Sequence, residues 1–67
     1  MKIILNNQPE EFHQDCLTVN ELLEIKKFTF KMLVIKINNR LIRKENYGSE
    51  QIREGDDVMV LHLVSGG

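Results

Sequence analysis

Two groups of residues have types and spacing that could do chemistry. The first is His13, Asp15 and Cys16, which have the side-chain types of a nucleophilic or metal-binding cluster. Alternation along a strand would send Asp15 and Cys16 to opposite faces, and the spacing matches no zinc-binding pattern. A lone cysteine just ahead of a helix in so small a protein is more typical of a packing residue. We therefore expect Cys16 to be buried and no metal to be bound.

The second group is the end of the chain, "LVSGG", where Val64 and Ser65 lead to Gly66 and Gly67. A C-terminal carboxylate is an acyl group, and adenylation by ATP turns it into a mixed anhydride that a nucleophile can attack. To react, it must enter the active site of another protein. Glycine suits a narrow channel because it has no Cβ and adopts unusual backbone angles. We expect a flexible tail over about residues 64–67 that carries the reactive carboxylate on Gly67.

Other catalytic or ligand-binding motifs are missing from the sequence. There is no G-x-G-x-x-G, no P-loop, no Cys-x-x-Cys and no H-E-x-x-H. Glu54, Asp56 and Asp57 surround Gly55 and are explained as a solvated turn. His62 stands among aliphatic residues, and we expect its imidazole on the solvent face of a strand, where contact with a partner is possible. Conventional catalysis by this chain is therefore not predicted.

Length and composition favour one small domain over residues 1–67. The 9 basic and 10 acidic residues give a net charge of −1, without the basic excess usual in a general nucleic-acid binder. A single cysteine allows no internal disulfide and fits a reducing compartment. The apolar start of the chain ends at Asn6 without a cleavage site, and no stretch reaches membrane-spanning length. We expect a cytoplasmic protein.

Apolar periodicity predicts six elements in the order β-β-α-β-β-β. Thr18 and Glu21 form a capping box at the start of the helix, and Asn38-Asn39 marks a tight hairpin turn. The predicted strands are 2–6, 12–16, 33–37, 40–43 and 58–64, the helix is 18–27, and residues 44–57 are irregular, with Tyr47 and Ile52 as apolar anchors. The first hairpin and the last strands then make one mixed sheet of an α+β fold.

The last strand is apolar on both faces, which favours an interior position in the sheet. One helix can cover only one face of that sheet. We expect Met59, Leu61 and Leu63 on one side of the strand, and Val58, Val60 and His62 on the side opposite the helix. An uncovered apolar face is typical of a partner surface, so Val58, Val60 and His62 are the predicted docking residues.

Three stretches together resemble the ThiS family of sulfur carriers, which has the ubiquitin-like β-grasp fold. They are "TVNELLE", "INNRLIRKENY" and "EGDDVMVLHLVSGG", and "LHLV" also stands in the last strand of ubiquitin. The resemblance covers essentially the whole chain. The sequence departs from the family at Lys26, Arg43 and Tyr47, where an apolar residue, Pro and Trp are frequent. These departures concern packing and leave the tail unchanged.

The resemblance implies a protein cosubstrate and not an enzyme. A ThiF-type, E1-like adenylyltransferase would activate Gly67 with ATP and magnesium, while the carrier itself binds no cofactor. Sulfur from a cysteine desulfurase would then give a thiocarboxylate, which a thiazole synthase of the ThiG type would use in thiamine biosynthesis. Gly66, Ser65 and Val64 would thread and direct the tail.

Three other readings remain open at this level. The same tail chemistry serves sulfur carriers for molybdopterin synthesis and for tRNA thiolation, and the small subunit of molybdopterin synthase shares the fold. It also serves ubiquitin-like modifiers attached to lysines. A plain binding module, whose sheet docks on a partner while the tail stays idle, is the third alternative.

Overall fold

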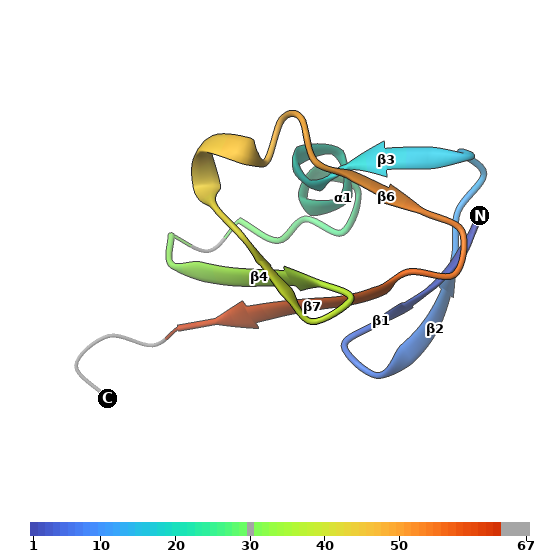
Figure 1. Cartoon of the computed structure of the whole chain (residues 1–67), viewed down its shortest axis with the longest axis horizontal. Coiled ribbons are helices and arrows are strands. Elements are labelled where there is room, and N and C mark those ends of the chain that lie inside the picture. The colour runs from blue at the N-terminus through green and yellow to red at the C-terminus, as the bar shows by residue number, and fades with distance from the viewer. Residues whose placement is uncertain (30, 64–67) are drawn as a thin grey trace.

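The chain folds as a curved sheet with a short helix packed across one of its faces (Figure 1). A computed structural model describes residues 1–29 and 31–63. In chain order the elements are β1 (Lys2–Leu5), β2 (Gln8–Glu11), β3 (Cys16–Thr18), α1 (Val19–Ile25), β4 (Leu33–Ile37), β5 (Arg40–Ile42), the 3₁₀ turn η1 (Lys44–Asn46), β6 (Gln51–Arg53) and β7 (Asp57–His62).

The described residues form a five-stranded mixed sheet in the order β2-β1-β7-β4-β5, and a separate two-stranded sheet of β3 and β6. β1 and β7 run parallel, whereas the other neighbours in the large sheet are antiparallel. β7 lies between β1 and β4, which confirms the interior position predicted for the last strand. The mixed sheet with one helix on one face is also confirmed.

Two Asn-Asn turns connect the hairpins. Asn6 and Asn7 have φ of 51° and 67°, and Asn38 and Asn39 have 51° and 69°, as a two-residue I′ turn requires at both central positions. The second turn was predicted. The first was predicted to run to residue 11 with a strand over 12–16, and that was wrong. Because the Asn6-Asn7 turn takes only two residues, β2 begins at Gln8. Pro9 lies on this edge strand, where the lack of a backbone N–H donor is tolerated.

The segment predicted to be irregular, residues 44–57, contains η1 and β6. β6 pairs with β3, placing Ile52 opposite Leu17 and Arg53 opposite Cys16. Each strand has only three residues, too few for a periodic pattern, and the pairing joins distant parts of the chain. Ile52 is buried and Tyr47 packs against the core, as expected of the two anchors. Cys16, in contrast, is exposed, so its predicted burial was wrong.

The helix begins as predicted and ends earlier. The Glu21 N–H donates to Thr18 Oγ1 at 3.1 Å, and the Thr18 N–H donates to Glu21 Oε1 at 2.8 Å, which completes the capping box. The helix ends at Ile25, not at residue 27, because Lys27 turns to a φ of 58°. The N–H of Phe28 then donates to the Leu23 carbonyl at 2.8 Å. This closure usually uses glycine, so the sequence gives no clear stop signal.

Replacing Thr18 with Ala should lower the free energy of unfolding by about 1 kcal/mol, because one helix N–H loses its side-chain acceptor. Urea unfolding followed by circular dichroism measures the change. Thr18→Ser keeps the hydroxyl and should stay close to the parent protein. Equal losses in the two variants would contradict the capping role.

One face of the sheet and the inner side of α1 enclose the core. Its buried side chains are Ile3, Leu5, Leu17, Val19, Leu22, Ile35, Ile37, Ile42, Ile52, Val58 and Val60. Val58 is 0% exposed and Val60 is 8% exposed, so their predicted place opposite the helix was wrong. Alternation separates the two sides of β7, but only the register with β4 shows which side α1 covers. Val58 lies opposite Ile37 and Val60 opposite Ile35, both of which are core residues.

In the described part of the chain, no helix is both long and apolar enough to cross a membrane.

Candidate functional site

The predicted reactive tail, Val64 to Gly67, lies outside the described residues. What the structure places is its root, Leu63, directly after β7. The Leu63 N–H donates to the Met32 carbonyl at 3.0 Å, which continues the β4–β7 ladder by one step beyond His62. β1 pairs with the start of β7, at Asp57 and Val58, whereas β4 pairs with it up to His62, so β4 holds the point where the tail leaves the domain.

The side of the sheet away from α1 carries a different set of side chains from the one predicted. We call this side the open face. Ile4, Leu41 and Leu61 are exposed on it, and Val34, Lys36 and Met59 are half-buried. Of the three predicted docking residues, Val58 and Val60 are in the core, and His62 alternates with Leu61 onto the helix side, where it is exposed at the strand end.

The register makes the open face continuous across neighbouring strands. Lys36 of β4 lies opposite Leu41 of β5 on one side and opposite Met59 of β7 on the other. Val34 lies opposite Leu61, two residues before the tail root. Around Lys36 the open face is therefore largely apolar, and it reaches the place where the tail begins.

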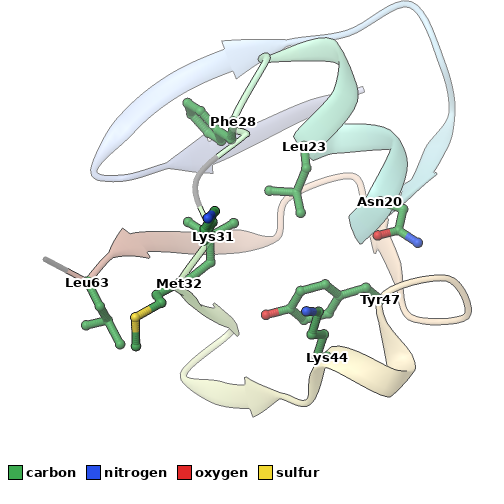
Figure 2. A pocket seen from close by; sticks show the side chains of 9 residues that line it. Asn20, Leu23, Phe28, Lys31, Met32, Lys44, Tyr47 and Leu63 are labelled. Atoms are coloured by element: carbon green, nitrogen blue, oxygen red, sulfur yellow. The ribbon is translucent and has the colours of Figure 1, made fainter. Parts of the chain in front are cut away.

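A hollow of about 650 Å³ lies on the other side of the tail root (Figure 2). It is bounded by α1, by the connection to β4, and by η1 and the residue after it. Its lining residues are Asn20, Leu23, Phe28, Lys31, Met32, Leu33, Lys44, Tyr47 and Leu63. Sequence reasoning missed it. Tyr47 was predicted only as an apolar anchor, and that role gives no sign of an opening beside it.

Tyr47 is the lining residue whose ring separates α1 from η1 in the hollow (Figure 2). Desolvation by burial raises the pKa of its phenol above the ordinary value of 10.0. The hydroxyl therefore keeps its proton at neutral pH and can donate a hydrogen bond. The backbone holds Tyr47 in place, since its carbonyl accepts from the Asn20 N–H at 3.0 Å. The hollow thus presents a fixed neutral donor.

His13, Asp15 and Cys16 do not form a reactive centre. All three are exposed, in the bend after β2 and at the start of β3. Within residues 1–29 and 31–63, no group of three or more His, Cys, Asp or Glu side chains is placed to hold a metal ion.

Comparison with known proteins gives one consistent result. The sequence model of the ThiS family matches residues 3–67. The chain is 27% identical over 63 residues to the sulfur carrier protein ThiS of Bacillus subtilis strain 168, covering 94% of this chain and 96% of that protein.

The fold is similar to that of solved structures. The crystal structure of the thiamine biosynthesis protein ThiS from Geobacter metallireducens superposes with a TM-score of 0.90, at 25% identity and with full coverage of both chains. A solution structure of a thiamine biosynthesis protein from the same organism gives a TM-score of 0.81 and is covered to 88%. Both matches extend over the whole of this chain.

Proposed function

Because the chain belongs to the ThiS family, and is on that ground a small sulfur carrier of thiamine biosynthesis and not an enzyme, we propose that the Gly67 carboxylate carries the sulfur. The observation that supports this most directly is the family match, which runs through Gly66 to Gly67. The sheet supports it as well, because pairing of β7 with β4 and the bond from the Leu63 N–H to the Met32 carbonyl hold the tail root.

The chemistry proceeds in balanced steps. A ThiF-type adenylyltransferase, using ATP and magnesium, joins the Gly67 carboxylate to AMP and releases pyrophosphate. The terminal sulfur of a persulfide, made by a cysteine desulfurase, attacks the acyl carbon and displaces AMP. A thiol then supplies two electrons to cleave the resulting acyl disulfide. The thiocarboxylate is left on Gly67 as the sulfur donor for a thiazole synthase of the ThiG type.

The tail residues have separate parts in this proposal. Gly66 leaves room in a narrow channel because it has no side chain. Val64 and Ser65 set the direction of the tail from Leu63. The proposal places the protein in the cytoplasm, where ATP is available and where the exposed thiol of Cys16 stays reduced.

Intact-mass measurement tests the proposal. The purified protein is incubated with its ThiF-type enzyme, ATP, magnesium, a cysteine desulfurase and cysteine. We expect a mass gain equal to the replacement of one oxygen by sulfur, located on the C-terminal peptide. A mass that stays unchanged with active enzymes would refute the proposal, and a Gly-Gly remnant on lysines of other proteins would indicate a modifier instead.

We place the docking of the adenylyltransferase on the open face, which reaches the tail root through Leu61. Leu61→Ser should raise the dissociation constant about tenfold, because an exposed apolar contact is lost at the interface. Calorimetric titration measures it. Ile25→Ser is the matched control. Ile25 is 44% exposed, close to the 43% of Leu61, and it lies at the end of α1, away from the open face. Equal effects in the two variants would contradict the assignment.

A further inference from the structure

We propose that the hollow beside the tail root is a second contact site for the adenylyltransferase, and that it takes an apolar side chain flanked by carboxylates. This inference rests on the proposed function for its partner. It concerns the helix side of the molecule, which the open face does not include.

The walls of the hollow are apolar. Leu23 extends into it from α1 and Tyr47 approaches from the segment after η1, while Met32 and Leu63 lie together at one end (Figure 2). The floor of the hollow is formed by three half-buried side chains that pack against the core, so the core holds it in place. They are Leu23, Phe28 and Leu33. A small anion bound here would leave this apolar floor in water. A side chain from a partner would cover it and gain the free energy of apolar burial.

The rim of the hollow is positive. Lys31 and Lys44 are exposed, and no carboxylate is among the lining residues in the described part of the chain. The ion pairs that the structure describes use other cations, namely Lys26 with Glu10, Arg40 with Glu50 and Arg43 with Glu45. Lys31 and Lys44 form no ion pair with any residue that the structure describes, and beside an apolar floor they are complementary to carboxylates on either side of an apolar anchor.

The length of the tail brings the enzyme to this place. Four residues follow Leu63 in the sequence, and four fully extended residues span at most about 14 Å. An enzyme that reacts at Gly67 must therefore approach Leu63 closely. Leu63 is itself a wall of the hollow, so the surface that receives the tail also comes to lie over Lys31, Met32 and Lys44.

Charge reversal tests the inference by binding alone. The probe is the purified ThiF-type adenylyltransferase of the same organism, titrated calorimetrically with the full chain at low and at high salt. Lys44→Glu should raise the dissociation constant about tenfold at low salt, and the difference should shrink as salt screens the charges. Arg53→Glu is the matched control on β6, away from the hollow, and should bind like the parent protein.

A combined variant strengthens the comparison, because Lys31→Glu with Lys44→Glu should weaken binding further than either change alone. Similar dissociation constants for Lys44→Glu and Arg53→Glu would overturn the inference, and so would a parent protein that does not bind. Failure of the proposed function has a different readout. It would show as a parent chain that binds the enzyme and acquires no sulfur.

Discussion

Deletion of Gly66 and Gly67 should abolish thiocarboxylate formation while leaving the domain folded. The reactive carboxyl carbon would then belong to Ser65, two residues short of the enzyme's active site. The fold should persist because the core residues that the structure describes all lie at or before Val60, and the last ladder hydrogen bond described is that of Leu63. Intact mass after incubation with the sulfur-transfer enzymes measures the first effect, and a urea midpoint measures the second.

Two further variants test the same tail. Ser65→Ala changes a residue outside the reacting group and should still acquire sulfur. Gly66→Val adds a branched side chain in the channel and should slow adenylation about a hundredfold, as expected when reacting atoms are displaced by roughly 1 Å. Sulfur transfer by the truncated chain at the parental rate would show that the tail is idle and would favour a plain binding module.

Replacing Leu22 with Ala should cause the largest loss of stability among single changes in the domain. Leu22 is 0% exposed and lies where α1 meets the sheet. Deleting a buried leucine side chain costs about 2–5 kcal/mol through lost burial and the cavity left behind. A domain of this length has roughly 3–10 kcal/mol in total, so this one change should remove a large share of its free energy of unfolding.

Urea unfolding followed by circular dichroism measures this loss, and Leu41→Ala supplies the control. Leu41 is 59% exposed on the open face, so its truncation should change stability by less than about 0.5 kcal/mol. A comparable loss in both variants would contradict the core as described. Sulfur acquisition by Leu22→Ala should fall in parallel with its folded fraction, since no atom of Leu22 is required to touch the tail.

The two proposed contact surfaces meet at one point of the molecule. The open face reaches the tail root through Leu61, and the hollow reaches it through Leu63. The two surfaces both adjoin the end of β7. An enzyme that encloses the tail can therefore touch both, and loss of either one should weaken binding without changing the chemistry at Gly67.

Several local elements of the fold could be predicted from the sequence alone. Thr18 and Glu21 make the predicted capping box, Asn38 and Asn39 make the predicted turn, and Gly55 has the positive φ of 83° that its turn position suggests. β4 has the predicted bounds, Leu33–Ile37. Each of these depends on interactions within a few residues, so a short stretch of sequence is enough to specify it.

The proposed reactive end of the chain also follows from the sequence. A diglycine after a predicted interior strand suggested acyl chemistry on Gly67 before any arrangement in space was known, and the three matching stretches suggested the family. The family is confirmed by the match over residues 3–67. The chemistry at Gly67 stays a prediction, because its residues lie outside the described part of the chain.

The surfaces around that end depend on contacts between distant segments. Alternation divides β7 into two sides, but pairing of Val60 with Ile35 shows that the valines face α1 and that Leu61 faces outward. β3 and β6 form because they find each other across the fold, which brings Cys16 to the surface opposite Arg53. The hollow joins side chains from α1, η1 and the end of β7. These segments meet because the helix packs against one face of the sheet. That packing joins residues far apart in the chain, so no short stretch of sequence specifies which segments meet.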